Sequence, residues 1–528
     1  MPADISFSVP AKSPGYSPEI DTVELRETKD TLKAVPNEEL STDISVDPVS
    51  STGKPKLPEM NLDKGIVGWD SQEDPSMPLN FSQNRKWALL AQITAITFVS
   101  PLSSTIFAPG ATFMDKDFHN SNSLLSSFTV SVYILGYVLG PLFIAPASEC
   151  WGRRPVLSAT NWWYVIWQAG CAVAPNIGCL IAFRFLAGLG GAGCMTLNGG
   201  IIADLFVPEE RGAANALAAI GVIFGPVIGP IFGAFIGQRA GWRWIFWVLC
   251  CLSGVITIVI QIFNKESYAP VIIARKTAKL SKELGRKDLR SCYDVDEVET
   301  KPEKFQREFT RPLRMLFLSP VIALFCTYMS LVYGLLYLLL TTLPMVYTET
   351  YHWSTELTGL ASLGIGIGFF VGLVVIGLTS DKIIVKLTNW NGGIYEPEMR
   401  LPYMTLFAIL IPISFFWYGW AADKAVHWIV PIIALSPFGF GMLGIFFPIQ
   451  MYLIDAFPVH SASAMAALTV SRSLVGALLP MAGPQLYSSL GLGWGNSLLG
   501  FIALLMVPMP YYLWKYGGTI RKRHVIKL

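Results

Sequence analysis

Residues 124–147 read LLSSFTVSVYILGYVLGPLFIAPA, a run without a single charged side chain. An α-helix needs about 20 apolar residues to cross roughly 30 Å of hydrocarbon, so this run is long enough to span a membrane. The residues that follow it, 148–155, read SECWGRRP. A glycine that permits a tight turn and two arginines at the end of a span predict that this end faces the cytoplasm.

Similar apolar runs recur along the rest of the chain. The twelve runs lie near 87–110, 124–147, 156–174, 177–203, 213–237, 244–263, 315–345, 357–380, 402–422, 428–454, 463–488 and 494–514. Only Arg184 and Arg472 place a charge inside any of them. Buried helices of a soluble protein would have amphipathic faces, which these runs lack. The sequence therefore predicts an all-α integral membrane protein with twelve transmembrane helices.

A long polar break at 264–314 divides these runs into two groups of six. This division is typical of two six-helix pseudo-repeats with a central path between them. We expect an N-terminal six-helix half over 81–263, a cytoplasmic central loop over 264–314 and a C-terminal six-helix half over 315–515. Residues 516–528 would form a basic cytoplasmic tail.

The composition agrees with a membrane protein, because 52% of the residues are hydrophobic and only 14% are charged, against about 25% charged in soluble domains. Residues 1–80 hold 15 Asp and Glu against 7 Lys and Arg, whereas the other 448 hold 22 against 32. The Pro-, Ser- and acid-rich segment 1–80 is predicted to be a disordered cytoplasmic tail. No soluble basic domain is present that could bind nucleic acid.

The charges between the runs predict the orientation of the protein. With the N-terminus inside, the cytoplasmic flanks, loops and C-terminus of the twelve runs hold 26 Lys and Arg, and the external loops hold four. The positive-inside rule then places both termini in the cytoplasm of a multi-pass protein of the cell membrane. The N-glycosylation sequon at Asn80 would also be cytoplasmic, so we expect no glycan.

The loop after the second run contains a candidate conformational latch. Its residues are Glu149, Gly152, Arg153 and Arg154. Arginines at a membrane boundary can hold helix C-termini or an acid, and Glu149 is the expected partner. The alternative is that the two arginines only anchor the topology.

The fifth run contains a candidate gating helix, in which Gly221, Gly225 and Gly229 recur every four residues beside Pro226 and Pro230. Glycines at this spacing let another helix approach closely, and prolines bend a helix. Close packing alone would explain the glycines, but the repeated Gly-Pro pair favours a pliable gating helix.

Polar and aromatic residues inside the runs are candidates for a substrate cavity. They are Gln92, Gln168, Asn198, Tyr333, Tyr337 and Gln450. Each could instead make a packing hydrogen bond or an interfacial anchor. Few polar groups among many aromatic ones favour an apolar or aromatic substrate. The eight cysteines and five scattered histidines show no metal-site spacing, and no phosphate-binding loop is present. We therefore expect no metal, no cofactor and no enzymatic activity.

These segments resemble those of the major facilitator superfamily, in particular its twelve-span fungal drug:proton antiporters. The loop at 140–155 resembles the family signature Gly-x-x-x-Asp-x-x-Gly-Arg-Arg, with Ala145 in place of the glycine and Glu149 in place of the aspartate. Residues 184–188 are similar to the fourth-span Arg-x-x-x-Gly motif. Residues 221–229 resemble the antiporter motif Gly-x-x-x-Gly-Pro-x-x-Gly, and further matches cover nearly all of 66–517.

The resemblance implies alternating access by a monomer in the lipid bilayer, driven by inward proton flow. It gives Arg184 a proton-linked role, but a guanidinium does not release protons at useful pH. We therefore expect Asp115 or Glu356 to titrate. The expected function is proton-coupled efflux of small, largely apolar organic toxins, either secondary metabolites or antifungal drugs. The alternatives are a polyamine exporter of the same family and a membrane nutrient sensor that does not transport.

Overall fold

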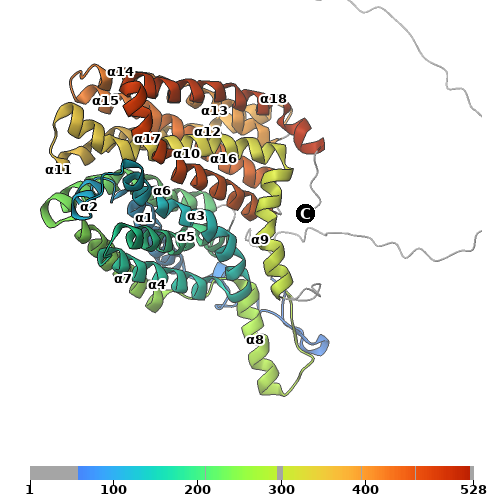
Figure 1. The fold of residues 1–528 in the computed structure, drawn as a ribbon. Helices are drawn as coiled ribbons and strands as arrows, with labels where there is room; N and C mark the ends of the chain where they lie inside the picture. The colour runs from blue at the N-terminus through green and yellow to red at the C-terminus, as the bar shows by residue number, and fades with distance from the viewer. Residues whose placement is uncertain (1–56, 208–209, 294–300, 394, 458–459, 524–528) are drawn as a thin grey trace, which may run out of the picture. The chain divides into compact units, whose positions relative to one another are not determined.

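The computed structural model describes residues 57–523 except 208–209, 294–300, 394 and 458–459, all of them within one compact unit. The described residues are almost entirely helical (Figure 1). Their one sheet is the parallel pair β1 (Ile66–Val67) and β2 (Arg290–Ser291).

Six long helices correspond to the first six predicted spans. They are α1 (Gln83–Thr105), α3 (Ser123–Trp151), α4 (Arg153–Ala172), α5 (Ile177–Leu205), α6 (Arg211–Ala240) and α7 (Trp242–Phe263). A short helix, α2 (Ala111–Asp117), follows α1. The side chains of Asn122 and Asn176 accept hydrogen bonds from the first backbone N–H groups of α3 and α5. These caps satisfy donors that have no partner within the helix and so fix where the two helices begin.

The remaining spans are formed by helices after the central loop. They are α10 (Pro320–Tyr351), α12 (Leu363–Trp390), α13 (Leu401–Ala408), α14 (Leu410–Asp423), α15 (Ile429–Ala434), α16 (Ser436–Ala456), α17 (Ser461–Met506) and α18 (Pro508–Arg523). The short α11 (Thr355–Thr358) precedes α12. The helices α13 and α14 together form the ninth span, and α15 and α16 together form the tenth. Gly491, with φ of 74°, breaks α17 into two arms, so the eleventh span is its first arm and the twelfth is its second arm with α18.

Ten described stretches are long and apolar enough to cross a membrane by composition. One of these stretches, Ser461–Arg521, contains both arms of α17 and therefore two spans. The remaining span is α4, the third along the chain, which is less apolar because it contains Asn161 and Gln168.

The helices pack mainly within two groups. In the first, α1 packs on α6, and α5 packs on α3 and α4; in the second, α17 packs on α10 and α14, and α12 packs on α16. The groups meet mainly where α3 packs on α17 and where α6 packs on α11 and α12, and more narrowly where α1, α3 and α6 approach α10. Movement of one group against the other must therefore occur at these interfaces.

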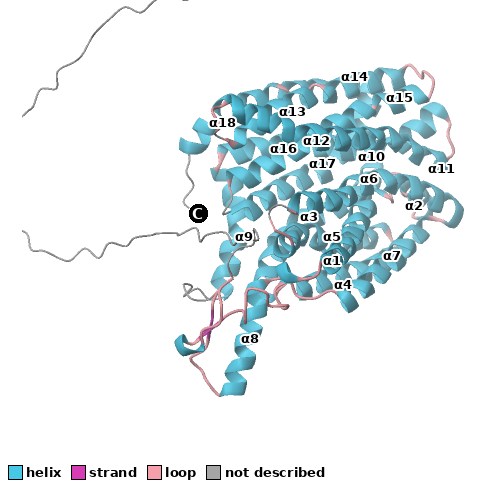
Figure 2. Ribbon diagram, turned by 180° about the vertical axis from the view of Figure 1, so that it is seen from behind, coloured by secondary structure: helices cyan, strands magenta, loops and turns pink. Residues whose placement is uncertain are grey.

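A small folded element, which we call the cap, lies outside the helix bundle. It consists of residues 57–80, α8 (Ala269–Leu284) and residues 285–293, with β1 and β2 beside α8 (Figure 2). Its core is formed by the buried side chains Val67, Trp69, Met77, Ile273 and Leu289. The indole Nε1 of Trp69 donates a hydrogen bond of 3.2 Å to the Tyr293 hydroxyl.

The cap corrects the prediction of a disordered segment over 1–80 for residues 57–80. Val67, Trp69 and Met77 bury their side chains against the central loop, more than 190 residues later in the chain, and no local pattern shows this. Residues 1–56 lie outside the described residues. The C-terminal segment is helical as far as Arg523, and residues 524–528 also lie outside the described part.

Charged groups hold the cap together. Lys276 Nζ lies 2.8 Å from Asp70 and 4.0 Å from Asp74, and it donates to the Gly68 carbonyl oxygen. Burial acts to raise the pKa of Asp74, but hydrogen bonds from the backbone N–H groups of Ser76 and Asp70 outweigh burial and lower that pKa. The carboxylate form of Asp74 is therefore the form that stabilises the cap.

Candidate functional site

Arg153, the first residue of α4, is held by three elements near the cap. Its Nε lies 3.3 Å from Asp204 Oδ2 near the C-terminus of α5, and its Nη1 donates to Ser148 Oγ at 2.5 Å. The guanidinium also lies 4.7 Å from the centre of the Tyr268 ring. The carboxylate that the structure pairs with Arg153 is Asp204, a residue that the sequence did not single out as the partner.

The other predicted latch residues lie around the same point. The backbone N–H of Arg153 donates to Glu266 Oε1 at 2.8 Å, and Gly152, with φ of 103°, has no room for a Cβ because Glu266 fills that space. Burial and the nearby Glu149 carboxylate raise the pKa of Tyr268 to about 12. Arg154 points elsewhere and donates to the Gln261 carbonyl oxygen on α7 at 3.1 Å.

The glycine stripe of α6 faces α1. A Cβ at Gly221 would lie 3.0 Å from Phe98 N, and one at Gly225 would lie 2.9 Å from Leu102 N. At Gly229 it would meet Thr105 Oγ1 at a still shorter distance. Thr105 Oγ1 also donates to the Pro226 carbonyl oxygen at 2.9 Å, a carbonyl that has no helical partner because Pro230 lacks an N–H. The stripe therefore brings two backbones of the same half together.

The opposite face of α6 meets the second half. Ser362 Oγ donates to the Val227 carbonyl oxygen at 2.8 Å, and Gly359 lies directly against the Pro230 carbonyl. Pro226 and Pro230 leave backbone carbonyls without their usual helical partners, since proline has no N–H. The helix α6 is thus held between α1 on one side and the start of α12 on the other.

Arg184 is a buried charge of the first half, with 1% of its surface exposed. Its Nη2 donates to the Val130 carbonyl oxygen at 3.0 Å, and its guanidinium lies over the rings of Phe107, Tyr133 and Phe246. Its Nε and Nη1 have no hydrogen-bond partner. Carbonyl dipoles and aromatic faces stabilise this cation.

The two acids predicted to titrate are held by other groups. Asp115 accepts hydrogen bonds from Asn120 at 2.7 Å and Ser126 at 2.6 Å. Glu356 lies 3.5 Å from Arg239 in an ion pair that links the first half to the second. The structure does not bring either acid into an ion pair with Arg184 among the described residues.

A chain of hydroxyl groups connects the two halves at the centre of the bundle. Ser104 Oγ of α1 and the Tyr337 hydroxyl of α10 share a hydrogen bond of 2.9 Å, and the Tyr337 hydroxyl lies 3.5 Å from that of Tyr333. Ser100, one turn earlier on α1, bonds to the hydroxyls of Tyr133 and Tyr137. Neither serine was among the predicted cavity residues, although their i, i+4 spacing on an apolar helix places them on one face.

The other cavity candidates are less closely connected. Gln168 is fully buried and donates to Ser103 Oγ at 2.8 Å, whereas Gln92 Oε1 and Asn198 Oδ1 are buried without a partner. Gln450 is half-buried. Of the six candidates, only Tyr333 and Tyr337 touch each other through a hydrogen bond that the structure shows. Among the described residues, no three His, Cys, Asp or Glu side chains gather as they would around a metal ion.

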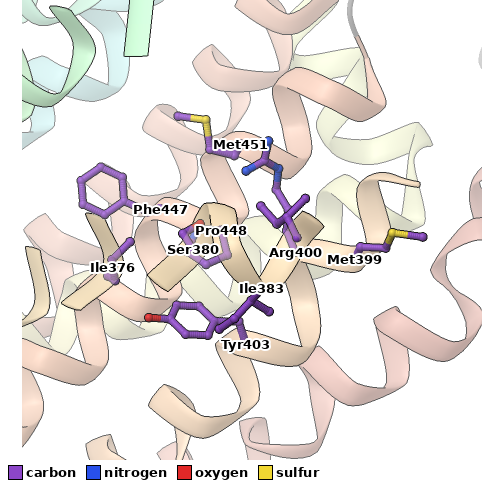
Figure 3. Close-up of a pocket in the computed structure, with 10 residues that line it drawn as sticks. Ile376, Ser380, Ile383, Met399, Arg400, Tyr403, Phe447, Pro448 and Met451 are labelled. Carbon is purple, nitrogen blue, oxygen red and sulfur yellow. The ribbon is translucent and has the colours of Figure 1, made fainter. Parts of the chain in front are cut away.

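A pocket lies within the second half, between α12, α13 and α16 (Figure 3). Ser380 and Tyr403 supply hydroxyls, and Ile376, Phe447 and Met451 supply apolar walls. Its one cation, Arg400, is already paired with Asp455 at 2.7 Å. None of the six cavity candidates lines this pocket, so it is separate from the hydroxyl chain at the centre.

Comparison with known proteins agrees with this architecture. The sequence model described as Major Facilitator Superfamily matches residues 93–480. The chain is 48% identical to the MFS-type transporter penM of Penicillium rubens over 484 residues, 92% of this chain and 94% of that protein. It is 46% identical to the MFS transporter cpaT of Aspergillus oryzae, over 90% of this chain and 94% of that one.

Solved structures show the same fold at low sequence identity. The xylose transporter XylE from E. coli, in a partially occluded inward open conformation, is 17% identical with a TM-score of 0.61, and the match covers 82% of this chain and 98% of that one. The predicted fold of twelve transmembrane helices in two six-helix pseudo-repeats is confirmed. The chain belongs to the major facilitator superfamily and is a membrane transporter rather than an enzyme.

Proposed function

We propose that this transporter exports small, largely apolar organic compounds, such as fungal secondary metabolites or antifungal drugs, in exchange for protons. The observation that carries this proposal is the central cluster at which Ser104 of the first half meets Tyr337 of the second. Hydroxyls and aromatic rings at the junction of the halves suit a mostly apolar ligand that needs few oriented polar contacts. A ligand there would contact both halves and would bias their relative position.

Export by alternating access is supported by the position of α6. Its close packing on α1 makes it move with the first half, while Val227 and Pro230 contact Ser362 and Gly359 at the edge of the second. A helix in this place transmits movement at one interface to the centre. The resemblance of residues 221–229 to an antiporter motif favours export over uptake.

For proton coupling we propose that Asp115 or Glu356 binds the transported proton and that Arg184 is a fixed positive charge. Glu356 is the better candidate, because its ion pair with Arg239 crosses between the halves and protonation would weaken that pair. We further propose a monomer in the cell membrane with both termini in the cytoplasm and no resident cofactor.

A polyamine exporter has less support from the described residues. A polycation needs carboxylates in the transport path, but the buried acids described are Asp74 in the cap and Glu398 just before α13. Glu398 is also already paired with Arg521 at 3.1 Å. A nutrient sensor that does not transport is distinguished from a transporter by measuring flux.

The test uses inside-out membrane vesicles from a yeast strain that lacks its own drug exporters and expresses the full chain. Nile red, rhodamine 6G and pyrenebutyrate serve as neutral, cationic and anionic probes. We expect an acidic vesicle lumen to drive accumulation of at least one probe, and Glu356→Gln to abolish the dependence on the pH gradient. Equal accumulation in vesicles with and without the protein would refute efflux. Full pH-driven export by both Asp115→Asn and Glu356→Gln would refute the proton assignment.

A further inference from the structure

Arg472, on the first arm of α17, is a buried charge of the second half and has no assigned role. Only 5% of its surface is exposed. Its guanidinium lies 5.0 Å from the centre of the Tyr333 ring and 5.2 Å from that of Phe446. Its Nε and Nη1 are buried and make no hydrogen bond.

Arg184 also has an unpartnered Nε and Nη1, but Arg472 makes no hydrogen bond through any of its nitrogens to the residues that the structure describes. Arg153, Arg400 and Arg521 each pair with a carboxylate, and Arg184 donates to a backbone carbonyl. The ring faces of Tyr333 and Phe446 stabilise the positive charge of Arg472 but accept no hydrogen bond from its N–H groups. A buried cation with free donors is unfavourable unless a partner binds in some state of the protein.

Several described acids already have other partners. Asp455 is held by Arg400, Asp204 by Arg153, and Glu356 by Arg239. Asp115 accepts hydrogen bonds from Asn120 and Ser126. These four acids are engaged elsewhere, and a bound anion would supply the partner that Arg472 lacks among the described residues.

The surroundings of Arg472 contain aromatic rings and hydroxyl groups of α10. Gly476, one turn after Arg472, has no room for a Cβ because Tyr333 lies against it, so both residues face α10. Ser330, Tyr333 and Tyr337 follow one face of α10 at helical spacing, and Ser330 Oγ is also buried without a partner. The Tyr333 and Tyr337 hydroxyls continue to Ser104 of the first half.

We propose that Arg472 is the anion-binding residue of the transport site, and that the protein carries organic acids with an apolar body and one ionised carboxyl or enol group. This inference rests on the proposed export function and narrows its substrate class. The planar guanidinium presents adjacent N–H donors that match two oxygens of a carboxylate or an enolate. The rings of Tyr333 and Phe446 then contact the apolar body, and the hydroxyls extend the contact to the first half.

The test is a binding titration on the purified full chain in detergent, read by energy transfer from tryptophan to pyrene. Pyrenebutyrate is compared with pyrenebutanol, which has the same apolar body and an alcohol in place of the carboxylate. We expect the wild type to prefer the acid, and Arg472→Gln to weaken acid binding about tenfold or more, as loss of a charged hydrogen bond does. Binding of the alcohol should change less than twofold.

Three variants complete the experiment. Arg472→Lys keeps the charge and should retain part of the preference for the acid, and Tyr333→Phe keeps the ring and should weaken only acid binding. Lys279→Gln removes one charge from an exposed side chain of the central loop and should change nothing. The proposal would be overturned if Arg472→Gln had the same ratio of acid affinity to alcohol affinity as the wild type. A variant that bound both ligands more weakly by the same factor would give that result.

Failure of this inference is distinguishable from failure of the proposed function. If the protein prefers pyrenebutyrate but no probe accumulates in vesicles with an acidic lumen, the anion site is supported and export is refuted. Proton-driven flux of Nile red without any preference for the acid supports export and refutes the anion site.

Discussion

The packing of α6 on α1 predicts that alanine substitutions along the glycine stripe destabilise the protein to different extents. At Gly221 a Cβ would lie 3.0 Å from Phe98 N, so a shift of a few tenths of an ångström suffices, whereas at Gly225 it would lie 2.9 Å from Leu102 N and the backbone of α1 must move further. At Gly233 it would overlap the Ile106 carbonyl oxygen, and the two backbones must separate. The expected order of destabilisation is therefore Gly221→Ala least and Gly233→Ala most.

The magnitudes follow from two opposing effects. Replacing a helical glycine by alanine stabilises a helix by about 0.5–1 kcal/mol, whereas overpacking a close contact costs about 1–3 kcal/mol. At Gly221 the two effects nearly cancel, and at Gly233 the steric cost dominates. Gly254→Ala in α7 is the matched control, because its Cβ would meet only Val165 Cγ1 at 3.9 Å. That variant should be as stable as the wild type or slightly more stable.

The assay is the temperature at which half of the detergent-solubilised protein is lost from the monodisperse peak in size-exclusion chromatography. Membrane proteins often unfold irreversibly, so the ranking of the variants is the observable rather than an absolute free energy. If Gly233→Ala proved as stable as Gly254→Ala, or if Gly221→Ala were the least stable, the close approach of α1 and α6 would be wrong.

Three further predictions concern the latch and the cap. Arg153→Gln should lower stability by about 1–3 kcal/mol because it leaves Asp204 without its cation, whereas Arg154→Gln should change it by less than about 0.5 kcal/mol; similar melting temperatures for the two would contradict this. Trp69→Ala empties the core of the cap and should expose residues 285–293 to limited proteolysis while the bundle keeps its elution volume; unchanged cleavage would mean the cap does not depend on this side chain. Because the pKa of Asp74 is lowered on folding from 3.8, its contribution is present above that pH and is lost as the pH falls through the lower folded value; cleavage of the cap should rise below about pH 3.8 in the wild type and be nearly independent of pH in Asp74→Asn.

Much of the membrane architecture could be predicted from local sequence. A long apolar run with few charged residues predicts a span, and this criterion alone identifies eleven of the twelve spans. The run at 156–174 was found in spite of Asn161 and Gln168, because its aromatic residues keep it apolar around them. Helix breaks were less visible: Gly491 ends one span, yet nothing in the sequence distinguishes it from the many glycines inside helices.

The types of residue in the site could be predicted from the sequence, but the partner of each residue could not. Glu149 was expected to be the partner of the latch arginines, and the structure shows an ion pair between Arg153 and Asp204, which lies 51 residues later in the chain. The cap shows the same limit on a larger scale, since Trp69 looks exposed in a polar segment until the central loop covers it.

The sequence by itself determined that the chain crosses a membrane twelve times, because hydrocarbon demands about 20 apolar residues for each crossing and local composition is enough to meet that demand. It also determined that two arginines are buried, since a charge inside an apolar run has nowhere else to lie. Only the tertiary structure decided which groups surround each of them. Arg184 meets a backbone carbonyl and Arg472 meets none, because the neighbours of a buried side chain come from helices that are distant in sequence.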